Sequence, residues 1–336
     1  MRKRRALQIL SLILVCVFAL TACKKNVGTP EDNAASKEED TDDKDKDDQK
    51  SWLIGFSGID MENPYFITLE SAIKEELEGK NCDLIVKDPK TDPDTQAAQI
   101  KEMIDDGIDA IILSPVDWEK ITPSLEALKE AGVRIINVDT QVKEMDYVDA
   151  YIGSDNYNAG VLCGEDLIKR CPEGGKVAIL ECPTQNSVND RITGFEETLA
   201  NAENGFEIVA REDTSGEFQK SLEAAQKILS ENSDIVAIMC GNDQMAVGAK
   251  TAMNVAEQSQ ILIYGVDGSP DIKKELKKTE NQIAGTVAQS PINMGKDAAD
   301  TTINILNGKD YEKEIKEDVF MINQENVDMY GVDGWQ

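Results

Sequence analysis

The chain has 336 residues, enough for two domains with buried cores, so a small disulfide-stabilised scaffold is excluded. Acidic residues outnumber basic residues by 64 to 35, and the formal charge of −29 excludes nucleic acid as a partner, because such a chain repels a phosphate backbone. The sequence contains no histidine, which removes Ser-His-Asp and Cys-His catalysis and histidine-ligated zinc.

The first 23 residues have the pattern of an export signal. A basic stretch at residues 2–5 precedes an apolar run at residues 7–20, which is short for a membrane span. The run ends in Leu-Thr-Ala-Cys, which resembles the lipobox of bacterial lipoproteins, where the signal (here residues 1–22) is removed and the cysteine (Cys23) is acylated. The alternative is an uncleaved anchor helix with an incidental cysteine. Both interpretations place the protein outside the cytoplasm, attached to the membrane by its anchor alone.

A disordered acidic tether is predicted behind the lipidated cysteine, over residues 23–50, because this segment is highly charged and holds almost nothing apolar. An Asp-x-Asp-x-Asp run at residues 43–47 has the spacing of a calcium loop. The glycine and glutamate positions of such a loop hold Asp48 and Ile54, so no metal site is predicted. The five cysteines beyond Cys23 form no Cys-x-x-Cys pair, and no cofactor is expected.

From residue 51 onward, short apolar runs alternate with segments of helical periodicity. The first series predicts strands at 52–57, 83–86, 110–113 and 133–138, with helices at 64–78, 94–106 and 119–131. The second series predicts strands at 177–180, 206–210, 235–240, 261–266 and 283–287, with helices between them such as those at 156–169 and 217–229. Continuous apolar strands are typical of parallel sheets that are covered on both faces. The sequence therefore predicts an α/β fold with two doubly wound parallel-sheet lobes.

Polar residues follow the ends of several predicted strands. They occupy the stretch from Gly58 to Phe66 and the positions of Asp139, Asn242, Asp267 and Gln289. Ligands of doubly wound sheets bind at the carboxyl ends of the strands, so these residues are the first candidates for a binding site.

Seven motifs occur in the order found in the ribose-binding and galactose-binding proteins of sugar ABC transporters. They are IGFS (54–57), NPYF (63–66), IGSDN (152–156), RITGF (191–195), GNDQMAVGA (241–249), GVDGSP (265–270) and AQ (288–289). Over about residues 51–325 the chain resembles this family. Sugar-responsive repressors have the same lobes, but an export signal and tether stand where their DNA-binding helices would be.

The resemblance implies a type I periplasmic binding protein, whose two lobes are joined by three crossings and close on a sugar. The crossings are expected near Ser154, Gln289 and Asp318. The amino lobe is expected to comprise residues 51–154 plus 290–318, and the carboxy lobe residues 155–289 plus 319–336. A monomer is expected, with a small-molecule sugar and an ABC permease as its partners.

Sugar hydroxyls both donate and accept hydrogen bonds, so carboxylates and amides recognise them with directional strength. Asp139 and Asp267, from opposite lobes, are the predicted carboxylate contacts. The predicted amide contacts are Asn63, Asn242 and Gln289. The resemblance implies that Arg191, with Asn189 beside it, supplies the basic contact and that Tyr65 and Phe66 stack on the ring. We expect Asp267 to face water when no ligand is bound.

Each assignment has a structural alternative. The Asp267-Gly268 pair is compatible with a plain turn, and the Tyr65-Phe66 pair is compatible with the apolar face of a helix. Asn242 is compatible with an N-cap role, and Arg191 is compatible with an ion pair inside its lobe. The functional interpretation is favoured because polar residues from five strand ends converge on one cleft.

The chain departs from the ribose binders at three places: Thr140, Asn189 and the Ser215-Gly216 pair. Ribose itself is therefore not assigned as the ligand. Phe218 and Trp118 are candidates for the aromatic residue that is missing near Ser215, although Trp118 also fits a loop or packing position.

Three functions follow from these observations. The first is a lipoprotein that captures a monosaccharide or small saccharide and delivers it to a permease. The second is a sensor that presents a sugar, a furanosyl signal or a nucleoside to a membrane receptor. The third, an exported enzyme with Asp139 and Asp267 as its acid and base, is disfavoured because lobes that must reopen exclude water poorly.

Overall fold

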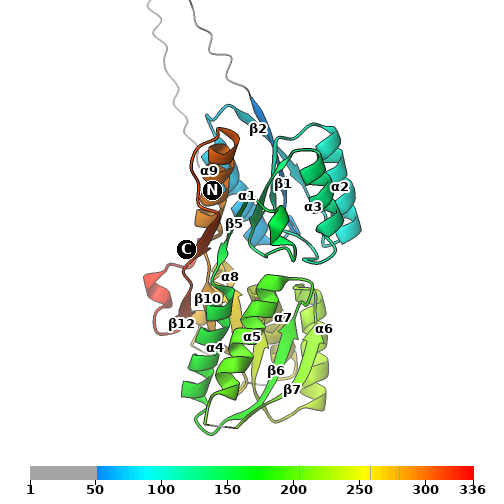
Figure 1. Cartoon of the computed structure of the whole chain (residues 1–336). Coiled ribbons are helices and arrows are strands. Elements are labelled where there is room, and N and C mark those ends of the chain that lie inside the picture. The colour runs from blue at the N-terminus through cyan, green and yellow to red at the C-terminus, as the bar shows by residue number, and fades with distance from the viewer. Residues whose placement is uncertain (1–50, 204, 258, 280) are drawn as a thin grey trace, which may run out of the picture. The chain divides into compact units, whose positions relative to one another are not determined.

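A computed structural model of the chain describes residues 51–336 except 204, 258 and 280. The predicted signal, the lipidated Cys23 and the acidic tether lie outside the described residues. The described part of the chain folds into two six-stranded sheets flanked by helices (Figure 1). None of the helices described is long and apolar enough to cross a membrane.

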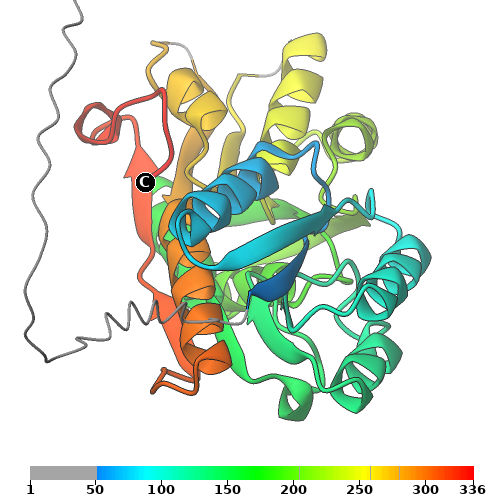
Figure 2. The same cartoon turned by 90° about the horizontal axis from the view of Figure 1, so that it is seen from above.

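The first sheet has the strand order β11-β5-β4-β3-β1-β2, and all neighbouring strands run parallel. Its strands are β1 (Trp52–Ser57), β2 (Cys82–Lys87), β3 (Ala110–Leu113), β4 (Arg134–Val138), β5 (Ala150–Ser154) and β11 (Glu314–Glu317). Its helices are α1 (Pro64–Leu77), α2 (Pro93–Asp105), α3 (Thr122–Glu130) and α9 (Pro291–Leu306). In Figure 2, α9 (orange) lies beside α1 (blue), while α2 and α3 lie on the other side of the sheet. We call this sheet and its helices the amino lobe.

The second sheet has the strand order β12-β10-β9-β8-β6-β7. Its strands are β6 (Gly175–Glu181), β7 (Phe206–Asp213), β8 (Ile235–Cys240), β9 (Leu262–Asp267), β10 (Ile283–Ala288) and β12 (Phe320–Asn323). Its helices are α4 (Asn156–Arg170), α5 (Asn186–Ala200), α6 (Phe218–Glu231), α7 (Asp243–Val255) and α8 (Pro270–Leu276). All neighbouring strands are parallel except β12, which runs antiparallel to β10. We call this sheet and its helices the carboxy lobe.

The burial of each strand follows from its place in the sheet. Every residue of the inner strands β3 and β10 is buried, whereas the edge strands β2 and β11 have no fully buried residue and each expose two positions. The α/β prediction of two doubly wound lobes is confirmed. The strands β5, β11 and β12 were not predicted, and β12 departs from the parallel pattern. Helix α3 begins at Thr122, later than predicted, because the side chain of Asp117 accepts the amide hydrogens of residues 119 and 120 in a turn.

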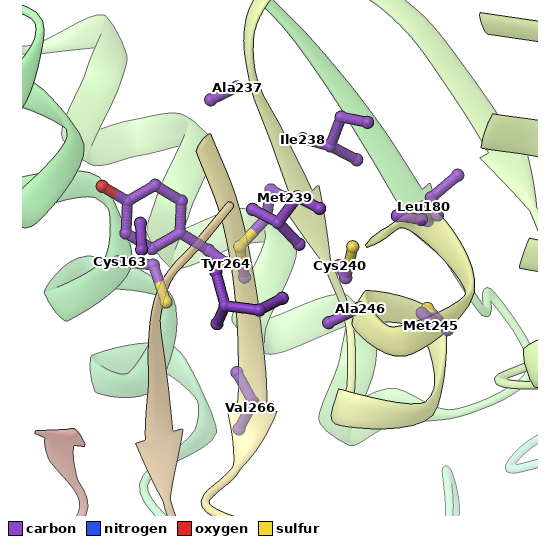
Figure 3. Close-up of a cluster of buried hydrophobic side chains, with 14 of the residues drawn as sticks. Cys163, Leu180, Ala237, Ile238, Met239, Cys240, Met245, Ala246, Tyr264 and Val266 are labelled. Atoms are coloured by element: carbon purple, nitrogen blue, oxygen red, sulfur yellow. The ribbon is translucent and has the colours of Figure 1, made fainter. Parts of the chain in front are cut away.

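The core of the carboxy lobe packs around the second sheet. Figure 3 shows Cys163, Cys240 and Tyr264 within it, among aliphatic side chains of β8 and β9. All five cysteines of the described chain are free thiols. Cys182 and Cys240 are buried, as expected of small apolar residues, and Cys82 is half-buried.

The chain passes between the two sheets three times. It crosses from β5 to α4, from β10 to α9 and from β11 to β12, close to Ser154, Gln289 and Asp318. The first two crossings are tied together, because the Ser154 hydroxyl donates to Oε1 of Gln289 at 2.9 Å. The residue boundaries given above for the lobes stay a prediction, whereas the three-crossing connection is a feature of the fold.

Candidate ligand-binding site

A cleft of about 340 Å³ lies between the two lobes, at the carboxyl ends of their strands. Residues that follow β1, β2 and β4 line it from the amino lobe, and residues at or after the ends of β6 to β10 line it from the carboxy lobe. Eight of the nine residues predicted to bind the ligand line this cleft: Asn63, Tyr65, Phe66, Asp139, Arg191, Asn242, Asp267 and Gln289.

The amino-lobe wall combines an aromatic pair with a carboxylate. Tyr65 and Phe66 lie in the first turn of α1, and their rings meet edge to face with centroids 5.2 Å apart. The Tyr65 hydroxyl donates to Oδ1 of Asp139 at 3.1 Å, and the Ser114 hydroxyl donates to Oδ2 at 3.1 Å. Two neutral hydroxyl groups therefore orient the Asp139 carboxylate.

The carboxy-lobe wall is centred on Arg191, a side chain only 3% exposed. Its Nε donates to Oδ1 of Asn156 and its Nη1 to the carbonyl of Gly241, both at 2.8 Å. Nη1 lies 3.8 Å from Oδ1 of Asp267, so the predicted alternative of an ion pair within the lobe is partly realised. Within the described chain Nη2 makes no hydrogen bond, which leaves one edge of the guanidinium for a ligand.

Close packing of α5 on α4 holds Arg191 in place. A Cβ atom at Gly160 of α4 would stand 1.8 Å from the carbonyl oxygen of Arg191 and 2.7 Å from the amide nitrogen of Phe195. Only glycine permits the two helix backbones to approach this closely.

Asp267 is held by two donors and does not face open water. Oδ1 accepts from Nε2 of Gln289 at 2.7 Å, and Oδ2 accepts from the amide of Asp243 at 3.2 Å. The residue is 7% exposed. Our expectation of a water-facing carboxylate is therefore wrong, because neighbouring strand ends of the same sheet supply donors that enclose it.

Both predicted carboxylates have unusual backbone conformations. Asp139 has φ 68° and Asp267 has φ 144°, in the region that favours glycine. At Asp139 the Tyr151 hydroxyl bonds the carbonyl at 2.9 Å, and the amide donates to the Ile152 carbonyl at 2.9 Å. Backbone strain of this kind persists only where the surroundings enforce it, and it concentrates at ligand sites.

The electrostatics of the site are dominated by burial. Desolvation raises the pKa of Asp139 and of Asp243, and desolvation together with the charge of Asp243 raises the pKa of Asp267 to about 7. The charge of Arg191 acts in the opposite direction on all three carboxyl groups. Hydroxyl donors from a ligand would favour the ionised carboxylates in the same way as the donors already present.

Asn63 and Asn242 act as helix caps as well as lining the cleft. Oδ1 of Asn63 accepts from the amide of Tyr65 at 3.0 Å, and Oδ1 of Asn242 accepts from the amide of Met245 at 2.9 Å. The N-cap alternative for Asn242 is thus confirmed, and it fixes the direction in which each amide group points.

A family model described as a periplasmic binding protein domain matches residues 54–310 of the chain. The chain belongs to this family. It is 29% identical over 268 residues to the ribose import binding protein of Bacillus subtilis, covering 80% of this chain and 86% of that protein.

Two solved structures show how closely this periplasmic binding protein matches its relatives. A solute-binding protein of Actinobacillus succinogenes with bound D-allose is 27% identical, with a TM-score of 0.75, and the match covers 83% of this chain and all of that one. The arabinose-binding component of a Shewanella transporter, bound to L-arabinofuranose, is 28% identical, with a TM-score of 0.75 and coverages of 83% and 94%.

Asn189 is the predicted contact that does not line the cleft of this binding protein. Its Nδ2 instead donates to the carbonyl of Pro183 at 3.0 Å. Of the two candidates for the missing aromatic, Phe218 lines the cleft. Trp118 does not line it, and the Lys143 ammonium lies 5.9 Å from the centroid of its ring.

Several cleft residues were not predicted from the sequence. Gln185, Gln244 and Glu217 line the cleft. Asp60 and Glu62 also line it, but they belong to the candidate stretch from Gly58 to Phe66. Gln185, Glu217 and Gln244 follow the ends of β6, β7 and β8, so the strand-end rule applied to every strand would have found them. The described residues contain no group of three or more cysteine or acidic side chains placed to hold a metal ion.

The two lobes touch each other at the edge of the cleft. The amide of Ser187 donates to Oγ1 of Thr140 at 2.9 Å, and the amide of Trp118 donates to the carbonyl of Thr184 at 3.0 Å. Thr140, one of the departures from the ribose binders, therefore serves as a contact between lobes.

Proposed function

We propose that this periplasmic binding protein captures a monosaccharide or small saccharide between its lobes and delivers it to an ABC permease. The observation that carries the proposal is the convergence of a carboxylate from each lobe, an aromatic pair and a buried arginine on one cleft. Paired hydroxyls of a sugar ring satisfy the carboxylates and the guanidinium, and the C–H face of the ring packs on the aromatic rings.

The relatives support this ligand class without selecting one sugar. One is named for ribose import, and the solved structures hold an allose and an arabinofuranose. These compounds share a ring that carries several hydroxyl groups, which is what the polar walls of the cleft recognise. The family is one of binding proteins, so we propose that the ligand leaves the site chemically unchanged.

The extracytoplasmic anchor is also a proposal. The basic stretch, the apolar run and Cys23 support export, removal of residues 1–22 and acylation of the cysteine. Replacing Cys23 by Ser should release folded, ligand-competent protein from the membrane fraction. Retention of the Cys23→Ser variant in that fraction would contradict the lipid anchor.

A saccharide panel tests the ligand class. Purified protein is melted in the presence of pentoses, hexoses, inositols and nucleosides, and positive compounds are titrated by calorimetry. At 100 times Kd a ligand stabilises the native state by about 2.7 kcal/mol, which raises Tm by several degrees in a protein of this size. Stabilisation by nucleosides but by no saccharide would contradict the proposal, as would the absence of any response.

A further inference from the structure

The C-terminal residues 331–336 return to the boundary between the two lobes. The buried Lys273 of α8 donates from Nζ to the carbonyl of Gly334, and the Ser290 hydroxyl, beside the second crossing, donates to the carbonyl of Gln336. The carboxy lobe and the second crossing therefore hold this tail, which lies beyond the 54–310 segment matched by the family model.

The tail places Trp335 against the aromatic pair of the amino-lobe wall. The rings of Trp335 and Tyr65 meet edge to face with centroids 5.8 Å apart and an angle of 74° between their planes. The same Tyr65 side chain donates its hydroxyl to Asp139, so Trp335 contacts the residue that orients the amino-lobe carboxylate.

A second cavity of about 200 Å³ lies beside the sugar cleft, with Trp335 in its wall. Four residues line both spaces: Asn63, Pro64, Gln244 and Asp267. A ligand ring that bonds Asp267 in the cleft therefore contacts a residue that also lines this second cavity.

The lining of the second cavity indicates what it accepts. Pro64, Pro270 and the Trp335 ring offer apolar surface for C–H groups, in the way that aromatic rings bind sugar faces. Asp243 and Asp271 also line it, and together with Asp267 they disfavour an anionic group such as a phosphate.

We propose that this cavity is an extension of the sugar site that takes an uncharged substituent of the ligand ring, such as an O-alkyl group or a second sugar, and that Trp335 determines which substituents fit. The inference rests on the proposed function. It assigns to the protein a substituted saccharide, or glycoside, as its preferred ligand.

The test uses the tightest-binding saccharide of the panel and its mono-O-methyl derivatives, one for each hydroxyl, titrated by calorimetry. One derivative should bind as well as the parent or up to about fourfold tighter, since a buried methyl group contributes about that factor. A derivative that is methylated at a hydroxyl group bonded to the cleft walls should bind more than about tenfold weaker, because methylation removes the hydrogen-bond donor to a charged side chain. A tenfold or larger loss for every derivative would overturn the inference.

Two variants connect the effect to Trp335. Trp335→Ala should weaken binding of the favoured derivative about fourfold relative to binding of the parent saccharide. Trp335→Phe should restore the ratio of the two affinities because a ring is retained. Melting curves check that both variants fold. An equal change for parent and derivative in Trp335→Ala would overturn the role of Trp335. If no saccharide binds the unaltered protein, both the proposed function and this inference fail. If the parent saccharide binds but every O-methyl derivative binds at least tenfold weaker, only the inference fails.

Discussion

The two walls of the cleft hold their carboxylates by different means. On the amino lobe, two hydroxyl groups orient Asp139, from Tyr65 and Ser114. On the carboxy lobe, Asp267 is held by an amide side chain and a backbone amide, with the Arg191 guanidinium 3.8 Å away. Hydroxyl groups rotate to new partners when an acceptor is lost, whereas a backbone amide cannot. We infer that the amino-lobe wall tolerates change better than the carboxy-lobe wall.

The largest effect is expected from Arg191→Leu. This change removes the guanidinium that lies 3.8 Å from the buried Asp267 carboxylate, and loss of one partner of a buried pair costs about 3–5 kcal/mol. We expect saccharide affinity to fall by about 30-fold or more, because truncating a buried charge partner costs about 2–5 kcal/mol of binding. Denaturant titration and calorimetry measure the two effects.

The matched control at this position is Arg191→Lys, which keeps the charge and loses the planar fork. It should recover much of the stability and little of the affinity. Wild-type affinity in Arg191→Leu would show that the guanidinium does not contact the ligand.

Replacing each carboxylate in turn tests the difference between the walls. Asp267→Ala and Asp139→Ala should each weaken saccharide binding about 10-fold to 150-fold, the value of hydrogen bonds to a charged group. Asp267→Ala should also lower the free energy of unfolding by about 1–3 kcal/mol, because the Gln289 amide and a backbone amide lose their acceptor. Asp139→Ala should cost less stability, since its donors rotate. The reverse order of stabilities in denaturant titrations would refute the comparison.

The raised pKa of Asp267, about 7, predicts a pH dependence of binding. Ligand hydroxyls bond the ionised carboxylate, so affinity should fall up to about tenfold for each pH unit below 7, with proton release on binding. The stability of the ligand-free protein depends on pH in the opposite direction. The stability that comes from the protonated group is fully present below its ordinary pKa of 3.8 and is lost as the pH rises through about 7.

Calorimetry between pH 5.5 and 8, in buffers of different ionisation enthalpy, measures this linkage. The Asp267→Asn variant should remove most of the pH dependence. A flat affinity profile in the unaltered protein would show that Asp267 does not titrate with binding.

The smallest effect is expected at the contact between lobes. Thr140→Val removes the acceptor of the Ser187 amide, a hydrogen bond worth about 0.5–1.5 kcal/mol. Since the bond joins the two lobes, the loss should appear as about 2-fold to 12-fold weaker saccharide binding with faster dissociation. Stopped-flow dissociation measures this rate. Unchanged dissociation would show that the contact does not stabilise the closed form.

The sequence predicts the walls of the site better than it predicts their surroundings. Asp139, Asp267 and Gln289 were recognisable because parallel strands bring their carboxyl ends to one edge of a sheet. The enclosure of Asp267 was not predictable, since its donors Gln289 and Asp243 follow other strands and approach it only after the sheet forms.

Two further features have no signal in the local pattern. The direction of β12 depends on its pairing with β10. The four residues of β12, three of them apolar, carry no information about whether the strand pairs parallel or antiparallel. Trp335 lies in a tail without periodicity, and only the folded chain brings it against Tyr65.

A crystal structure of the protein with the tightest-binding saccharide tests the central claim most directly. We predict a sugar ring between the Tyr65-Phe66 pair and Arg191, with hydroxyl groups within hydrogen-bond distance of both Asp139 and Asp267. A saccharide bound outside this cleft, or one that contacts a single lobe, would contradict the account.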